Sequence, residues 1–160
     1  MLPKNNIRVL ERNSSDNEYL HKDFHGALCY AIKYLDQTYG KETATEYLQQ
    51  VGRETFSPLI TALKQEGLIA LEQYFKHVFE LEGGLAEFKR EEHCLVITVS
   101  KCPAIAHLKS TGQLFTERYC ETTVNVNKAI CDAAGYQCSC NYTPGMGCCV
   151  QKFWKKEDAK

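Results

Sequence analysis

The sequence lacks several features that mark large protein classes. It has no run of about 18 apolar residues, so we expect no membrane-spanning helix and no membrane partner. Its 19 basic and 20 acidic side chains leave a net charge of −1, without a block of lysine and arginine that could follow a phosphate backbone. The first 20 residues lack the apolar core of about 7 to 15 residues that a secretory signal needs. We therefore expect no nucleic-acid partner and a cytoplasmic location.

Short catalytic signatures are also missing. The chain has no GxxxxGK[ST], GxGxxG, GxSxG or HExxH, so nucleotide hydrolysis, hydride transfer, serine hydrolase and zinc-protease chemistry have no support. It has no C-x-x-C pair either, so its cysteines fit no standard zinc ribbon or finger.

The patterns that are present predict one α+β domain. Apolar residues recur at helical spacing through four segments as far as the paired glycines 83 and 84, and β-branched strand patterns follow. The expected order is αααα-ββ-α-ββ, with N-terminal helices packed on a four-stranded antiparallel sheet. The expected elements are helices from 19 to 40, 42 to 52, 54 to 67 and 68 to 84, strands 85–90 and 93–101, a short helix 103–112 continued by a long helix 113–135, and a hairpin of 136–142 and 147–154. Residues 1–16 read as a flexible lead-in, 17–154 as the domain and 155–160 as a polar tail.

Nine cysteines are the most unusual part of the composition. Their number is odd, and in a reducing compartment clustered cysteines bind metals or catalyse reactions more often than they form disulfides. The alternative is that a cysteine is a small apolar core residue, which we expect of Cys29, Cys94 and Cys131. The roles of three further cysteines stay open: Cys138, Cys140 and Cys148.

Three cysteines are expected to meet in the fold. With Pro144 and Gly145 at the centre of the hairpin turn, Cys149 lies opposite Cys140. Cys120 stands in a polar part of the long helix, whereas Cys131 is about three turns further on. Cys102 precedes Pro103, which suits the first position of a helix, so the positive end of that helix should favour the Cys102 thiolate.

These three cysteines, Cys102, Cys120 and Cys149, would leave the fourth position of a metal ion open. Zinc is the first choice and iron the second, with no organic cofactor expected, and a metal-free nucleophilic site remains the competing interpretation. His25 lies in "HKDFHGALC" with His21 and Cys29 at steps of four, and Gly26 beside it permits close approach. We expect His25 to be a base or ligand that reaches the thiols, although a histidine satisfied at the edge of a helix explains it too. His107 is expected on the surface.

A family resemblance rests on "SKCPAIAHL", "FTERYCET" and "GMGCCVQKF", and on the helical stretch "DFHGALCYAIKYLDQTYGKETATEYLQQVG". Together these segments resemble the L-2-amino-thiazoline-4-carboxylic acid hydrolase family over most of residues 20 to 154. The resemblance points to Cys102, Cys120 and Cys149. The chain departs from the family pattern in "CVQKF", where an acidic residue and an aromatic often follow the last cysteine. The order of elements is distantly similar to 4-vinyl reductase-type ligand-binding domains and to small subunits of vesicle-tethering complexes.

The resemblance implies a hydrolase that opens a small cyclic amidine of the thiazoline type. Cys102 would be nucleophile or metal ligand, Cys120 and Cys149 ligands or thiol partners, and His25 or Glu121 the proton carrier. The alternative is a non-catalytic module that binds a metal or small molecule and signals to a partner. A small-molecule ligand is expected in both cases, and a homo-oligomer is left open.

Overall fold

The computed structural model describes residues 17–156, which form four helices followed by a mixed segment of strands and helices. The N-terminal helices are α1 (Asn17–Tyr39), α2 (Lys41–Thr55), α3 (Ser57–Glu66) and α4 (Leu68–Glu82). They are followed by β1 (Leu85–Arg90), β2 (Cys94–Lys101), α5 (Pro103–Ser110), the 3-10 turn η2 (Glu117–Cys120), α6 (Glu121–Ala134), β3 (Tyr136–Tyr142) and β4 (Cys149–Lys155).

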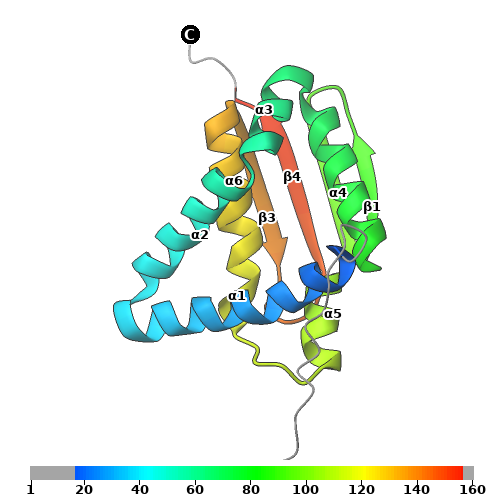
Figure 1. Cartoon of the computed structure of the whole chain (residues 1–160). Helices are drawn as coiled ribbons and strands as arrows, with labels where there is room; N and C mark the ends of the chain where they lie inside the picture. Colours follow the sequence, from blue (N-terminus) through cyan, green and yellow to red (C-terminus); the bar gives the residue numbers. More distant parts are fainter. Residues whose placement is uncertain (1–16, 157–160) are drawn as a thin grey trace, which may run out of the picture.

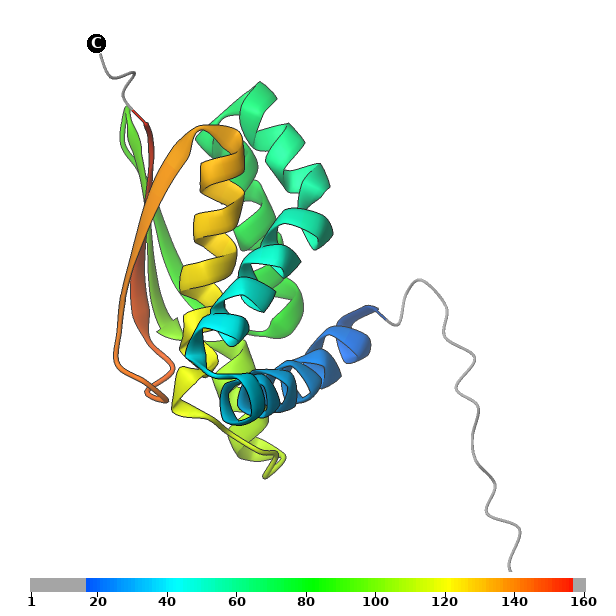
Figure 2. The ribbon, with the colours of Figure 1, turned by 90° about the vertical axis from the view of Figure 1, so that its left-hand side faces the viewer.

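The strands form one antiparallel sheet in the order β1-β2-β4-β3. The helices lie on one face of this sheet, with α6 and α4 next to the strands and α2 outside α6 (Figures 1 and 2). This arrangement confirms the α+β prediction and its order of elements.

The main core lies between the sheet and the helices. It consists of apolar side chains from α3, α4, α6 and the two central strands, among them Leu63, Leu71, Ile97, Ile130 and Phe153, none more than 2% exposed. Strand β2 alternates buried residues with half-exposed or exposed ones over Leu95–Val99, as a strand with one covered face should. Complete burial of a side chain such as Phe153 contributes about 1.5–3 kcal/mol to folding.

A second, smaller core holds the lower end of the molecule together. It joins α1, α2, α5 and η2 through Cys29, Ile32, Leu48, Leu108 and Tyr119. Cys102, Phe115 and Cys120 pack against its edge. Cys102 and Cys120 therefore stand at the border of this core, whereas Cys149 packs against the main core.

The expected long helix begins later than predicted. Residues 113–116 are not helical, and Cys120 belongs to the 3-10 turn η2, whose N-cap Thr116 accepts a hydrogen bond from the backbone N–H of Arg118. The backbone N–H of Thr116 in turn donates to the buried Cys29 thiol at 3.3 Å. These contacts hold the segment extended, so local side-chain bonding prevails over helical periodicity here.

The hairpin register also differs from the prediction. Cys149 lies opposite Tyr142 and Cys140 opposite Gln151, a shift of two residues from the expected Cys140–Cys149 pair. The turn is longer than two central residues and has positive φ at both Gly145 (72°) and Gly147 (74°). Because the shift is even, Cys138, Cys140 and Cys149 keep their predicted common face of the sheet, whereas Cys148 lies in the turn before β4.

The predicted domain limits stay predictions. The predicted lead-in, residues 1–16, and residues 157–160 of the predicted tail lie outside the described residues, while β4 continues to Lys155. Among the described helices, none is sufficiently long and apolar to cross a membrane.

Candidate functional site

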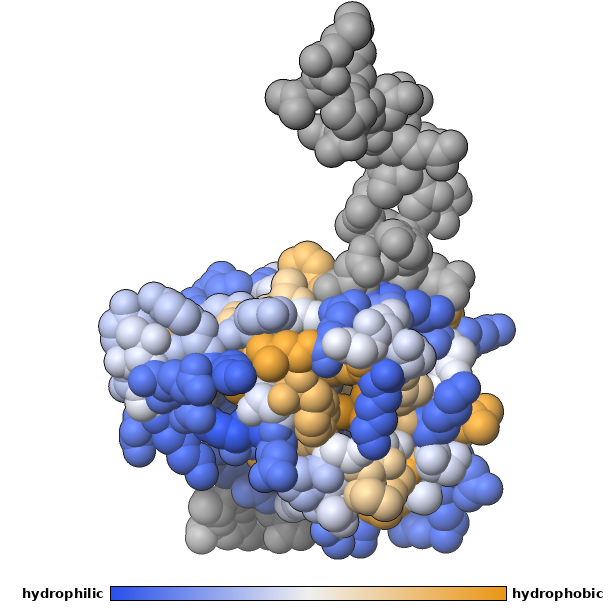
Figure 3. Space-filling view, turned by 90° about the horizontal axis from the view of Figure 1, so that it is seen from below, coloured by the Kyte–Doolittle hydropathy of each residue, from blue (hydrophilic) through white to orange (hydrophobic). Residues whose placement is uncertain are grey.

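The turn between β3 and β4 folds back over the junction of β2 and α5. The backbone N–H of Cys102 donates to the carbonyl of Gly147 at 2.7 Å, and the two residues are close enough that a Cβ on Gly147 would lie 4.0 Å from the Cys102 Cβ. Lys109 on α5 also donates to the Gly145 carbonyl at 2.6 Å. Figure 3 views this end of the molecule, where apolar side chains gather in the middle of a hydrophilic rim.

Cys102 is the N-cap of α5, as predicted, but its thiol is not an easily ionised one. Burial raises the pKa of Cys102 more than the backbone N–H groups of Ile105 and Ala104 lower it, and nearby Cys149 and Cys120 raise it further. The expectation that the helix would favour the thiolate is wrong, because desolvation outweighs two hydrogen bonds from the first turn of a short helix.

Cys120 behaves similarly. Its thiol accepts a hydrogen bond from the backbone of Gly145, which lowers its pKa, but burial raises the pKa by more, and Cys149 and Cys148 add to the increase. The turn therefore contacts both Cys102 and Cys120, which come from separate elements.

Cys149 is the cysteine of the three whose pKa the surroundings lower. A hydrogen bond from Cys140 lowers its pKa to about 7 against the opposing effect of burial, and Gln151 lowers it further. The Gln151 amide donates to the Cys149 sulfur at 3.5 Å, and buried Asn127 donates to the Gln151 carbonyl oxygen at 2.9 Å. The bond from Asn127 fixes the amide so that its nitrogen, a donor only, faces the sulfur.

The three predicted cysteines are thus close enough to influence one another's ionisation, and all of them adjoin the β3–β4 turn. Within residues 17–156, however, no group of three or more His, Cys, Asp or Glu side chains is arranged to hold a metal ion. Zinc and iron stay predictions.

His25 joins a buried chain of hydrogen bonds. Its Nε2 lies 2.9 Å from a Glu82 carboxylate oxygen, and its Nδ1 lies 2.8 Å from the Tyr119 hydroxyl. Tyr119 and Glu82 are 6% and 7% exposed. Burial raises the pKa of Tyr119 well above its ordinary value, and Cys102 and Cys29 raise it further. The chain therefore runs from Glu82 through His25 and ends beside the predicted thiols.

Glu121, the other predicted proton carrier, has a different environment. Arg118 donates to both of its carboxylate oxygens, at 3.0 and 2.7 Å, and lowers the pKa of Glu121. Arg118 also bonds Asp36 on α1. A carboxylate engaged in this way stays ionised, and its partner Arg118 joins η2 to α1. We therefore assign the proton-carrying part to His25 and Tyr119.

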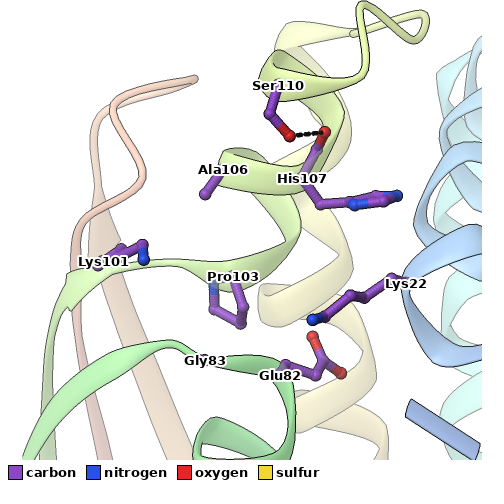
Figure 4. Close-up of a pocket in the computed structure, with 8 residues that line it drawn as sticks. All are labelled: Lys22, Glu82, Gly83, Lys101, Pro103, Ala106, His107 and Ser110. Carbon is purple, nitrogen blue, oxygen red and sulfur yellow. Dashed lines mark hydrogen bonds between the residues drawn. The ribbon is translucent and has the colours of Figure 1, made fainter. Parts of the chain in front are cut away.

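A hollow on this side of the molecule lies beside Pro103 and is lined by no cysteine. It has a volume of about 290 Å³ and is lined by residues from α1, α4, α5 and the end of β2: Lys22, Glu82, Gly83, Lys101, Pro103, Ala106, His107 and Ser110 (Figure 4). His107, expected on the surface, is half-buried here. Glu82 connects this pocket to the His25–Tyr119 chain.

The remaining cysteines divide as follows. Cys29 and Cys131 are 0% and 1% exposed, which fits core packing, whereas Cys94 is half-exposed. Cys138, on β3, accepts a hydrogen bond from Cys131, which lowers the pKa of Cys138 and raises that of Cys131. Cys148 is exposed. The side chain of His21 lies outside the described residues.

Three comparisons with known proteins found no match: models of protein families, curated proteins and solved structures. The resemblance to the aminothiazoline hydrolase family therefore stays a prediction.

Sequence reasoning missed Gln151, Asn127 and Tyr119. Gln151 stands two residues after Cys149 on a strand, so the two share a face, and this spacing was a usable signal. The contacts Asn127–Gln151 and Tyr119–His25 join residues 24 and 94 positions apart, so no local sequence pattern predicts them.

Proposed function

We propose that the lower end of the molecule is a thiol hydrolase site for a small cyclic amidine, with Cys149 as the nucleophile. One observation carries the proposal: Gln151 and Cys140 lower the pKa of Cys149, while burial raises the pKa of Cys102 and Cys120 nearby. Environments that push neighbouring pKa values apart define an attacking group and a proton donor. The predicted roles of Cys102 and Cys149 are thereby exchanged.

The chemistry proceeds in two balanced halves. The Cys149 thiolate forms a bond to the amidine carbon, the ring C–S bond breaks, and the leaving sulfur takes the proton of Cys102. Water then adds to the same carbon, one of its protons passes to the amidine nitrogen, the other enters the chain of hydrogen bonds that restores the Cys102 thiol, and the bond to Cys149 breaks. The products are a urea-type group, a free thiol and the original thiolate.

The buried chain supplies the proton that Cys102 loses. The Tyr119 hydroxyl gives its proton toward Cys102 and is recharged through His25, while Glu82 holds the imidazole in place. His25 passes the proton to Tyr119, which alone lies beside the thiols, and Glu82 is a positioning residue. The Tyr119→Phe variant should therefore keep thiol alkylation at Cys149 but lower turnover sharply. The basic limb of the pH profile of the remaining turnover should also change.

Turnover of 2-amino-thiazoline-4-carboxylate by the purified protein tests the proposal directly. We expect Cys149→Ser to lower kcat by about a thousandfold or more and Cys102→Ser by roughly a hundredfold, since general acids contribute about 10²–10⁴. The matched control is Cys94→Ser, a half-exposed cysteine on β2 outside the site. Full activity in Cys149→Ser, with the fold intact by circular dichroism, would remove Cys149 from the reaction.

The second candidate is a non-catalytic thiol site that binds a metal ion, zinc ahead of iron. It is supported by three sulfurs from three elements that lie near one another, although the described side chains would have to turn to form a coordination shell. Elemental analysis of protein purified without oxygen separates the two: stoichiometric zinc without turnover favours the metal site, and turnover without metal favours the hydrolase. A homo-oligomer and the cytoplasmic location stay predictions.

A further inference from the structure

A second pair of cysteines lies where α6 is followed by β3. Cys131 is in the last turn of α6 and Cys138 is the third residue of β3, with Gly135 as the C-cap of the helix between them. The backbone N–H of Gly135 donates to the Cys131 carbonyl, and its own carbonyl accepts from the backbone N–H of Lys156. Figure 2 shows this turn at the opposite end of the sheet from the β3–β4 turn. The backbone therefore holds the two cysteines in fixed positions.

The two thiols are bonded to each other and differ in exposure. Cys131 donates a hydrogen bond to Cys138, which lowers the pKa of Cys138 against the effect of burial and raises the pKa of Cys131. Cys131 is 1% exposed, whereas Cys138 is half-exposed. An accessible thiol of lowered pKa attacks a disulfide sulfur readily, and a second thiol in contact with it displaces the remaining half. The second thiol needs no access to solvent, because it attacks only the sulfur of the first.

Both cysteines line a pocket of about 240 Å³ at β3, an edge strand of the sheet. The remaining lining residues are Lys128, Asp132, Gln137 and Trp154. Lys128 pairs with Asp132 at 2.6 Å and the Trp154 indole donates to Gln137 at 2.9 Å, so these polar groups bond one another. The volume is below the usual range of small-molecule sites, which suits one half of a small disulfide with the other half in solvent.

We propose that Cys138 and Cys131 form a redox-active dithiol that reduces small disulfides of the cystine class. The Cys138 thiolate forms a bond to one sulfur of cystine, the S–S bond of cystine breaks, and one free cysteine leaves as a thiolate. The Cys131 sulfur then bonds to the Cys138 sulfur, and the second free cysteine leaves with the proton of Cys131. Two electrons pass from the protein to cystine, and excess small thiol returns the pair to its reduced form by the reverse steps.

Reaction of the reduced full chain with cystine tests the proposal. The reaction is run in a background that replaces the other three cysteines of the tryptic peptide 129–152: Cys140→Ser, Cys148→Ser and Cys149→Ser. Only Cys131 and Cys138 then remain in that peptide, so resistance to iodoacetamide and a mass lower by two hydrogens identify their disulfide. We expect this internal disulfide to form, and excess free cysteine to restore the dithiol.

Single substitutions in the same background separate the two steps. In Cys131→Ser the displacing thiol is absent, so half of the cystine should stay on Cys138 as a mixed disulfide. In Cys138→Ser the attacking thiol is absent, and buried Cys131 should react with cystine at least roughly 10-fold more slowly than Cys138 does. The matched control keeps Cys140 in place of Cys138. Cys140 is the next residue on that face of β3 and should form no disulfide with Cys131.

The wild-type chain provides a second measurement that does not depend on the folding of the serine variants. Cleavage before Asp132 separates Cys131 from the cysteines of the hairpin, so the expected disulfide joins two peptides. Failure of Cys138 to react with cystine, a stable mixed disulfide on Cys138 while Cys131 is present, or an equally fast disulfide between Cys131 and Cys140 would overturn the proposal. Because the serine background lacks Cys149, none of these results depends on the proposed hydrolase function.

Discussion

Each cysteine in this chain has its chemistry set by its immediate neighbours. Cys140 and Cys149 lie diagonally across β3 and β4, and they share one proton in a hydrogen bond. The Gln151 amide contacts Cys149 and so selects it as the ionised partner, while the pKa of Cys140 is raised. A pair of chemically equal thiols thus becomes one thiolate and one donor.

The first prediction concerns this pair. Replacing Cys140 by alanine removes the largest effect that lowers the pKa of Cys149, so that pKa should rise from about 7 toward the ordinary 9.0. The thiolate fraction at pH 7 then falls from about half to a few per cent, and alkylation at that pH should slow roughly 10-fold or more. Iodoacetamide labelling followed across pH by peptide mass spectrometry, in a Cys148→Ser background, measures it.

The matched control is Cys138→Ala. Cys138 lies two residues before Cys140 on the same face of β3 but is hydrogen-bonded to Cys131. Its removal should leave the labelling profile of Cys149 unchanged. Equal profiles for wild type and Cys140→Ala would show that the Cys149 thiol does not depend on its neighbour.

The sequence alone predicts the element on which each cysteine lies, but not which cysteine has the lowest pKa. That Cys102 begins a helix follows from Pro103, and the structure confirms it. The degree to which Cys102 is buried depends on the turn at Gly147, forty-five residues further on, and on η2. Desolvation of the Cys102 thiol depends on the whole fold, so the direction predicted for its pKa shift was wrong.

The close crossing of α2 and α6 depends on one glycine. A Cβ on Gly52 would lie 2.8 Å from the Cβ of Ala129 and 2.9 Å from the carbonyl oxygen of Val126. These atoms belong to a buried helix and cannot turn away as the end of a long side chain can. The absence of a side chain at Gly52 therefore allows the outer helix to approach the helix that covers the sheet.

The second prediction follows from this contact. Replacing an internal helical glycine with alanine normally stabilises by up to about 1 kcal/mol. In Gly52→Ala we expect the opposite sign, a loss of roughly 1–3 kcal/mol in the free energy of unfolding, because the new methyl group overpacks the crossing. Urea titration followed by circular dichroism measures it.

Gly26→Ala on α1 is the matched control. Its Cβ would meet only the Oε1 end of Gln113, at 1.8 Å, and that side chain can rotate aside. We expect its stability to equal or exceed that of wild type. A stabilised Gly52→Ala would mean that α2 and α6 are further apart than described.

The hairpin shows which part of an element sequence can predict. Alternating residues identified β3 and β4 and the face on which each cysteine lies, since side chains alternate with a period of two. The register depended on the turn, and the prediction centred it on Pro144 and Gly145, whereas Gly147 also takes a positive φ. An error of two residues changed the partners but preserved the faces.

For the whole molecule, sequence predicted the class and order of the elements because apolar spacing is local information. No local sequence pattern predicts that α1 and α2, which lie away from the sheet in Figure 2, fold together with it. The structure joins them through the smaller core, where Ile32 and Leu48 pack with Leu108 and Tyr119, and through the crossing at Gly52. The predicted single domain therefore depends on whether these contacts couple the outer helices to the sheet.

The third prediction tests that coupling. Trp154, the only tryptophan, lies on β4 and donates from its indole N–H to Gln137 on β3 at 2.9 Å, so its fluorescence follows the sheet. Far-UV circular dichroism instead follows the helices, to which α1 and α2 contribute 23 and 15 residues. In one cooperative domain both signals change at the same urea concentration.

Leu48→Ala, which opens the smaller core, should lower the free energy of unfolding by about 2–5 kcal/mol. Both signals should then change together at a lower urea concentration. A helical signal lost before the fluorescence change, in wild type or in Leu48→Ala alone, would instead make α1 and α2 a separate folding unit.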